Sequence, residues 1–296
     1  MPNFNLQYFN QRLSNTLIGT ILLILTYLFF SVMELTAKEL ALRFNPFLIV
    51  FARYLSQLIL LLIIFNKQFK THLKSNHKPL QILRGALLMI TTCFMFTGLA
   101  YLQFAENISI YMIGPVITTI LAILILKEKI SFTQIFVVII GLIGALIIAS
   151  PNKGAFNYAV IFPFLAALCF AFFTISTKFL NTSDSNQTTL LFTAITGTIL
   201  SLPFIIYFWK WPNLNDAILM FCLGFLATAG HFLFIEALKV INASFAAPFV
   251  YLTVLLAAFW GYILYDEIPS QSTFIGAFLI ITSGFIITRF KKKNFK

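Results

Sequence analysis

The sequence has 296 residues, of which 60% are apolar and 10% charged, and its mean hydropathy is +0.94. A water-soluble domain of this composition would lack the polar side chains that cover a protein surface, so the soluble classes are excluded. The formal net charge of +11 does not indicate a nucleic-acid partner, because the basic residues gather at the ends of apolar stretches, as they do in membrane proteins.

Apolar stretches follow one another along the chain with short breaks between them. A bilayer core about 30 Å thick is crossed by about 20 apolar residues in a helix, and ten stretches have about that length. In chain order they cover residues 16–35, 46–65, 80–101, 107–126, 132–150, 157–179, 188–208, 216–237, 244–264 and 272–289. We therefore expect an all-α integral membrane protein with ten transmembrane helices, surrounded by the lipid bilayer.

Prolines occur both between these stretches and within them. The prolines in the breaks mark helix starts or turns, and they are Pro46, Pro79, Pro151, Pro212 and Pro269. Prolines within a stretch require neighbouring helices to satisfy the carbonyls that they free. These are Pro115, Pro163, Pro203 and Pro248.

The basic residues are distributed unevenly between the two sides of the predicted bundle. With the N-terminus in the cytoplasm, fifteen of the twenty lysines and arginines fall on the cytoplasmic side, including the 66–79 loop and the Lys291–Lys293 tail. Four fall on the opposite side, and Arg53 lies within the second predicted helix. Because cytoplasmic loops carry the excess of basic residues, the sequence predicts both termini in the cytoplasm and a location in the cell inner membrane.

The second half of the chain repeats the first. A shift of 138 residues superimposes 83–130 on 221–268 without a gap, and it pairs the acidic residues Glu128 and Asp266. This offset spans five predicted helices, and an odd number of spans turns the second half upside down relative to the first. We therefore expect a five-plus-five inverted repeat. Its two halves are residues 1–150 and 151–296.

Four segments resemble the EamA family of the drug/metabolite transporter superfamily. They are LRGALL at 83–88, LKEKISFTQIFVVIIGLIGALII at 126–148, EALKVINASFAAP at 236–248 and YDEIPSQSTFIGAFLIITSGFIIT at 265–288. Each segment is built from residues that are common in membranes, but their order and spacing are typical of the family. The resemblance covers nearly the whole chain and implies a transporter of a small-molecule substrate.

The run AAPFVYLTVLLAAFWGYILYDEIPS at 246–270 is similar to family members that take up S-adenosylmethionine or riboflavin, and less similar to the amino-acid exporters. The resemblance thus implies a secondary transporter or facilitator that moves a small polar metabolite by alternating access. An exporter of the same fold is the alternative.

Charged residues within the apolar stretches are candidates for the substrate site, because a charge at mid-bilayer costs at least about 2.5 kcal/mol and requires a partner, a wet cavity or a function. Arg53 lies about 8 residues into the second predicted helix, roughly 12 Å deep. It can bind a carboxylate or phosphate of the substrate, or form a fixed ion pair with Glu34. Glu34, near the outer end of the first predicted helix, can instead pair with Lys38 one turn later.

Arg84 and His231 are two further polar positions. Arg84 is only a few residues inside the third predicted helix, so we expect its side chain to reach the cytoplasmic headgroups. His231 is the only histidine in an apolar stretch, and it stands where the first repeat has Cys93. Its imidazole can contact substrate or carry a proton; the alternative is a packing residue with satisfied nitrogens.

Tyr251 and Trp260 of the ninth predicted helix offer flat surfaces with a polar edge, which suit stacking on a nucleobase, a flavin or an aromatic amino acid. The alternative is ordinary packing, since the chain has 36 phenylalanines. The sequence thus predicts a substrate site made of Arg53, Glu34, His231, Tyr251 and Trp260.

The sequence holds no motif of a recognised enzyme or ATP-driven pump, since it lacks HExxH, GxSxG, a P-loop and a glycine-rich dinucleotide motif. Cys93, Cys169 and Cys222 lie inside apolar stretches without paired spacing. We therefore expect no catalytic residue, no metal and no cofactor. An integral membrane enzyme is the rival from another class, and the sequence leaves a homodimer open.

Overall fold

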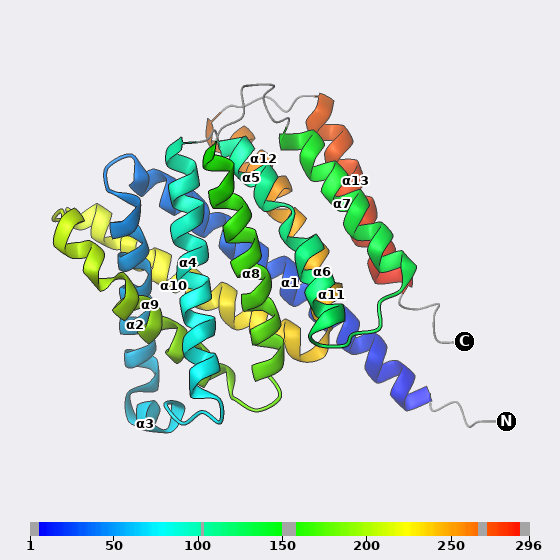
Figure 1. Cartoon of the computed structure of the whole chain (residues 1–296), viewed down its shortest axis with the longest axis horizontal. Coiled ribbons are helices and arrows are strands. Elements are labelled where there is room, and N and C mark those ends of the chain that lie inside the picture. Colours follow the sequence, from blue (N-terminus) through cyan, green and yellow to red (C-terminus); the bar gives the residue numbers. More distant parts are fainter. Residues whose placement is uncertain (1–5, 102–103, 150–157, 266–270, 291–296) are drawn as a thin grey trace.

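The computed structural model describes residues 6–101, 104–149, 158–265 and 271–290, and throughout this part of the chain every regular element is a helix (Figure 1). In chain order the elements are α1 (Leu6–Ala41), α2 (Pro46–Phe65), η1 (Asn66–Gln68), α3 (Phe69–His72), α4 (Lys78–Tyr101), α5 (Phe104–Tyr111), α6 (Gly114–Leu124), α7 (Phe132–Ala149), η2 (Tyr158–Val160), α8 (Ile161–Leu180), α9 (Asn186–Phe208), α10 (Leu214–Val240), α11 (Ala243–Ala246), η3 (Ala247–Tyr251), α12 (Leu252–Tyr265) and α13 (Gln271–Phe290). The η elements are 3-10 helices. The predicted features that lie outside the described residues are Pro151, Asp266, Pro269, the Lys291–Lys293 tail and the junction between residues 150 and 151.

Each apolar stretch expected from the sequence coincides with one helix or with a broken helix. In the described part of the chain, seven helices are long and apolar enough to cross a membrane, and three shorter apolar helices accompany them. The fourth expected stretch is divided into α5 and α6, neither of which is long enough to cross alone. The ninth is divided into α11, η3 and α12.

Side-chain caps fix where several of these helices begin. Asn45 precedes α2, and its side-chain oxygen accepts a hydrogen bond of 3.0 Å from the N–H of Phe47. Ser185 caps α9 and Asn213 caps α10 in the same way. Because the first N–H groups of a helix have no intrahelical partner, such caps stabilise a helix start at the edge of the bundle.

The four prolines within apolar stretches occupy different positions. Pro115 follows the break between α5 and α6, and Pro248 lies in η3, between α11 and α12. Pro163 lies in the first turn of α8, where its missing N–H costs little, and Pro203 lies inside α9. Proline cannot donate to the preceding turn, so Pro115 and Pro248 account for the breaks in the fourth and ninth stretches.

The helices of the two halves interleave. α1 packs along α10 as α8 packs along α4, α2 contacts α10 as α9 contacts α4, and α6 contacts α8 as α12 contacts α1. The remaining large contacts join α2 to α9 and α7 to α13. Each pairing is retained when every helix is exchanged for its counterpart in the other half. In Figure 1, α1 begins at the lower right and α8 at the upper edge, so the halves run in opposite directions, as in an inverted repeat.

Glycines allow α2 to approach its neighbours closely. A Cβ on Gly224 of α10 would lie 2.5 Å from the backbone nitrogen of Gln57 in α2. A Cβ on Gly197 of α9 would lie 2.2 Å from the ring of Tyr54 in α2. A side chain can rotate away from a clash and a backbone atom cannot, so the α2–α10 contact requires glycine at position 224.

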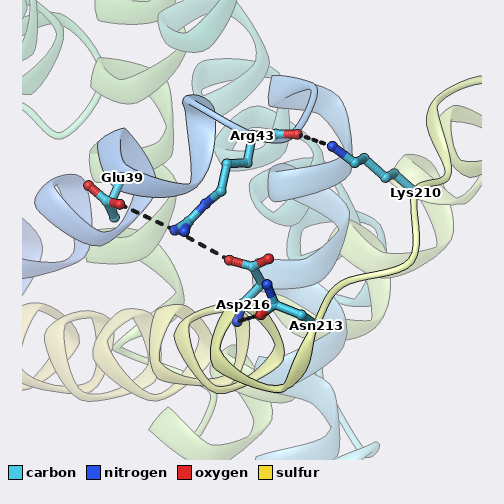
Figure 2. A network of polar contacts seen from close by, with 5 residues as sticks. All are labelled: Glu39, Arg43, Lys210, Asn213 and Asp216. Carbon is cyan, nitrogen blue, oxygen red and sulfur yellow. Dashed lines mark hydrogen bonds and ion pairs between the residues drawn. The ribbon is translucent and has the colours of Figure 1, made fainter.

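A polar network joins α1 to α10 at the end of the bundle where α1 ends and α10 begins (Figure 2). Nη2 of Arg43 lies 3.3 Å from a carboxylate oxygen of Glu39 and 3.3 Å from one of Asp216. Nζ of Lys210 donates to the Arg43 carbonyl at 3.0 Å. These charges at the helix ends are thus paired with one another rather than with the charged residues of the bundle interior.

Replacing Gly224 by alanine should destabilise the fold by about 1–3 kcal/mol, because the added methyl group would push α10 away from the α2 backbone. Denaturant unfolding of the protein in detergent micelles measures the change. Gly284→Ala in α13 is the matched control, since a Cβ there meets nothing within 4 Å. Equal stability of the two variants would contradict the close contact.

Candidate functional site

Arg53 of α2 is held in the interior of the bundle by groups from three helices. The residue is 4% exposed. Its Nη1 donates to Oγ1 of Thr92 in α4 at 2.8 Å and to the hydroxyl of Tyr54 at 3.3 Å. Its Nη2 lies 2.9 Å from Nε2 of His231 in α10. Among the described residues nothing accepts a hydrogen bond from its Nε, so the guanidinium is fixed in place with its Nε unused.

His231 is bound to Arg53 rather than packed as an isolated core residue. Arginine has donors and no acceptor, so Nε2 of His231 must accept the hydrogen bond from Arg53 and the ring must be the neutral form protonated on Nδ1. Nδ1 has no partner among the described residues. The rings of Phe30 and Phe173 lie against the imidazole, with centroid distances of 4.8 Å and 5.7 Å. The structure thus brings two of the predicted site residues together.

Glu34 lies on the face of α1 that packs on other helices. It continues the stripe of Leu23, Tyr27 and Phe30, which are at most 8% exposed and mark the face of α1 that packs on other helices. Glu34 itself is exposed. A residue on the buried face of a helix can be exposed only where the neighbouring helices leave space, so its carboxylate borders an interior space rather than lipid.

Among the described residues, no cation pairs with the carboxylate of Glu34. Between described residues the ion pairs are Arg43–Glu39, Arg43–Asp216 and Lys239–Glu236. Neither the ion pair with Arg53 nor the one with Lys38, both considered from the sequence, is formed. Phe30, one turn before Glu34, nevertheless packs against His231, which is bound to Arg53.

The two aromatic residues of the predicted site lie in different surroundings. Nε1 of Trp260 in α12 donates to Oγ of Ser31 at 3.2 Å, three residues before Glu34 on α1. Tyr251, at 0% exposure, donates its hydroxyl to the carbonyl of Val138 in α7 at 3.1 Å, within the main core. Trp260 therefore lies beside the turn of α1 that carries Glu34, whereas Tyr251 joins α7 to η3.

Arg84 does not reach the membrane surface, and this expectation from the sequence was wrong. The residue is 0% exposed. Its Nε donates to Oγ1 of Thr177 at 2.7 Å, and its Nη1 donates to Oγ1 of Thr193 at 2.5 Å. Its guanidinium lies 4.3 Å from the ring centroid of Phe173. Threonines of α8 and α9 offer acceptors inside the bundle, so the side chain turns inward instead of extending to the headgroups.

The break between α10 and α11 is held by two charged residues from elsewhere in the chain. Nζ of Lys178 in α8 donates to the carbonyls of Leu238 and Ile241, each at 2.6 Å. The carboxylate of Glu128 accepts from the N–H groups of Ala243 and Ser244 at 3.0 Å and 3.1 Å. A cation at a helix C-terminus and an anion at a helix N-terminus both complement the helix dipole. We call this arrangement the α10–α11 clamp.

On the same side of the bundle, the turn between α8 and α9 is joined to the segment before α4. The carboxylate of Asp184 accepts hydrogen bonds from Ser75 Oγ, from the Asn76 N–H at 3.1 Å and from Gln81 Nε2 at 2.8 Å. Burial disfavours the ionised carboxylate, but these hydrogen bonds and the neighbouring His77 outweigh it and lower the pKa of Asp184 below its usual value. The turn is therefore fixed by an ionised acid.

Several of these residues were not predicted from the sequence. Thr189 and Thr193 are spaced as one helix face and meet Gln81 and Arg84, so the helical period gave a signal that could have found them. For Thr92 the sequence contained no such signal, because a single threonine in an apolar helix is common. Within the residues that the structure describes, no group of three or more metal-binding side chains is close enough together to hold a metal ion.

A sequence profile of the EamA-like transporter family matches residues 17–150 and again residues 157–289. The chain belongs to this family. The two matches show that each half is one copy of the family's repeating unit, and the long apolar helices make the protein a multi-pass membrane protein. EamA-like proteins are transporters by description.

Individual relatives are similar over most of the chain. The S-adenosylmethionine uptake transporter of Rickettsia bellii is 30% identical over 284 residues, which cover 96% of this chain and 98% of the relative. The riboflavin transporter of Vibrio cholerae is 27% identical over 72% of each protein. A crystal structure that is 16% identical superimposes with a TM-score of 0.80 over 96% of this chain and 99% of the other, a likeness that concerns the fold alone.

His231→Phe should reduce the free energy of unfolding by about 1–3 kcal/mol, because the buried Nη2 of Arg53 would lose its acceptor. His231→Gln keeps an acceptor oxygen at this position and should lose less. Denaturant unfolding in detergent micelles compares the two variants. An equal loss in both would show that the ring's packing, and not its hydrogen bond, stabilises the bundle.

Proposed function

We propose that this protein is a secondary transporter that takes up a small polar metabolite of the S-adenosylmethionine kind across the bacterial inner membrane by alternating access. The observation that carries the proposal is the similarity to an S-adenosylmethionine uptake transporter over 96% of the chain. The site described above supports it, because the buried cation Arg53 and the exposed anion Glu34 face the interior of the bundle. Substrate moves through this site and no bond is broken.

The proposed topology has ten membrane spans, with both termini in the cytoplasm. The halves are residues 1–150 and 151–296, each with five spans. Two of the ten spans are broken, namely α5 with α6 and α11 with α12. The lysine-rich loops at the side of the bundle where α1 begins support the orientation, since basic residues remain in the cytoplasm.

Alternating access requires that one side of the bundle be closed while the other is open. The α10–α11 clamp and the contacts of Asp184 draw helices together on the side where α1 begins. Glu34 is exposed about seven residues from the opposite end of α1. We infer that this conformation is closed toward the cytoplasm, and that the clamp separates when substrate is released there.

The substrate contacts that we propose are Arg53, Glu34, His231 and Trp260, with Tyr251 as a wall residue. Arg53 and Glu34 supply charge, His231 fixes Arg53, and Trp260 supplies a flat surface on which a purine ring can stack. An exporter of the same fold would use the same contacts, so the direction of net transport decides between uptake and export.

Glu128→Gln should favour opening on the clamp side, because it removes a charge that accepts hydrogen bonds from the start of α11. Losing a hydrogen bond to a charged group costs about 1.5–3 kcal/mol, which should raise the open population about 10-fold or more. The measurement is the rate at which a membrane-impermeant maleimide labels Ala246→Cys in a background without the native cysteines. Glu39→Gln, at the opposite end of the bundle, is the control, and an unchanged rate for Glu128→Gln would contradict the gating role.

Proteoliposomes that contain the protein should take up labelled S-adenosylmethionine with saturable kinetics. Arg53→Ala should reduce the initial rate about 10-fold or more, because it removes a charged contact made with substrate. Arg43→Ala is the control, since Arg43 pairs with Glu39 and Asp216 at the end of the bundle. Membrane insertion is verified for each variant. Absence of uptake by the unaltered protein would overturn the proposed substrate. Net exit of the labelled compound from the proteoliposomes against its own inward-directed concentration gradient would indicate an exporter.

A further inference from the structure

The interior of the bundle contains charges of opposite sign that are not paired with each other. Among the described residues, no carboxylate lies within 4.0 Å of Arg53 or Arg84, and no cation lies within 4.0 Å of the carboxylate of Glu34. The described ion pairs all lie near helix ends. An isolated charge inside a membrane protein is costly, and removing its partner leaves an uncompensated charge. The unpaired state of Glu34 and Arg53 therefore indicates that their partners arrive with a ligand.

The positions of Glu34 and Arg53 suit a ligand that carries both signs of charge. They lie on consecutive helices, α1 and α2. Phe30, one turn before Glu34 on α1, packs against His231, which is bound to Arg53. Glu34 is exposed to the interior space, and Arg53 is held immobile by Thr92 and His231 with its Nε unused. Had the two side chains touched, they would have satisfied each other. Because they do not pair, each can take a counter-charge from a ligand.

An α-amino acid head group has the matching chemistry, because its ammonium and carboxylate are attached to one carbon atom. The ammonium would meet the acceptor-only carboxylate of Glu34, and the carboxylate would meet the donor-only guanidinium of Arg53. A charge-assisted hydrogen bond of this kind is about twice as strong as a neutral one. A neutral ring system such as a flavin would leave both residues unpaired. The chemistry of the two residues therefore distinguishes between the substrate classes of the relatives.

We propose that Glu34 and Arg53 form a recognition site for the α-amino acid head group of the transported metabolite, with the ammonium on Glu34 and the carboxylate on Nε of Arg53. The inference rests on the proposed function and narrows its substrate class to zwitterionic amino acids and their conjugates. Because Glu34 is open and Nε of Arg53 is enclosed, the ammonium binds first. The carboxylate reaches Arg53 as the surrounding helices rearrange.

Competition against uptake of labelled S-adenosylmethionine into proteoliposomes tests the site without any mutation. S-adenosylhomocysteine keeps the head group and lacks the methyl group and the positive charge of the sulfonium, so it should compete strongly. Decarboxylated S-adenosylmethionine lacks the carboxylate, and 5′-methylthioadenosine lacks the whole head group. Each should compete about 10-fold more weakly or worse, since a hydrogen bond to a charged group contributes about 1.5–3 kcal/mol. Riboflavin should not compete.

Two variants assign the two ends of the head group. In the unaltered protein, the inhibition constant of decarboxylated S-adenosylmethionine should be about 10 or more times that of intact S-adenosylmethionine. Arg53→Gln should bring this ratio to about 1, because the carboxylate loses its partner. Glu34→Gln should weaken every competitor that has the ammonium, while Glu39→Gln on the same helix should not, since Glu39 is paired with Arg43. Should Arg53→Gln fail to fold, the competitor series with the unaltered protein still decides the question.

Each outcome of the competition series has one meaning. Strong competition by S-adenosylhomocysteine with weak competition by 5′-methylthioadenosine supports the head-group site. Equal competition by these two compounds, in a protein that takes up S-adenosylmethionine, overturns the site and leaves the proposed function standing. Failure of labelled S-adenosylmethionine to enter overturns both.

Discussion

A buried guanidinium governs the arrangement of the middle of this bundle. Lipid offers no hydrogen-bond partner, so every polar group that enters the membrane must be satisfied by other parts of the chain. Arg53 obtains its acceptors from Thr92, Tyr54 and His231, which belong to three helices. These contacts require α2, α4 and α10 to meet at one depth. The requirement fixes the neutral form of His231 and brings the aromatic rings of α1 and α8 against it.

The same requirement acts at the breaks between helices. A break exposes the last carbonyls of one segment and the first N–H groups of the next, and in lipid these groups need partners. At the break after α10, Lys178 supplies donors to the carbonyls and Glu128 supplies acceptors to the N–H groups. Because Lys178 and Glu128 belong to different halves, the break is stable only when the halves are in contact. In the proposed transport cycle, this contact between the halves is the one that separates.

The fold could be predicted from the sequence to a large extent, because hydropathy and the 138-residue repeat are properties of long segments. The expected stretches coincide with helices, and Glu128, which the repeat pairs with Asp266, meets the start of α11 in the other half. The breaks in the fourth and ninth stretches were not predicted. Their apolar residues form one continuous run, and only the packing shows that Pro115 and Pro248 interrupt it.

The direction in which a single side chain points could not be predicted in this way. Arg84 and Arg53 are both a few residues inside a helix. For Arg84 we expected the side chain to extend to the headgroups, because its charge then stays in a polar environment. The structure turns it inward because Thr177 and Thr193, more than ninety residues away in the chain, supply acceptors. Partners so distant in sequence leave no local pattern. The link between Arg53 and His231, across 178 residues, was missed for the same reason.

The two halves are alike in packing and different in chemistry, and the proposed alternating access depends on both properties. An exchange of counterpart helices retains the large contacts, so states open to either side can be built from the same contacts and can have similar energies. A site with the same symmetry would present identical groups to both ends of a substrate whose ends differ. Here His231 stands where the first half has Cys93, whose Sγ lies 3.4 Å from Sδ of Met89 and forms no hydrogen bond with an arginine among the described residues. The difference at this one repeated position makes the scaffold asymmetric there, which suits the proposed substrate, whose two ends differ.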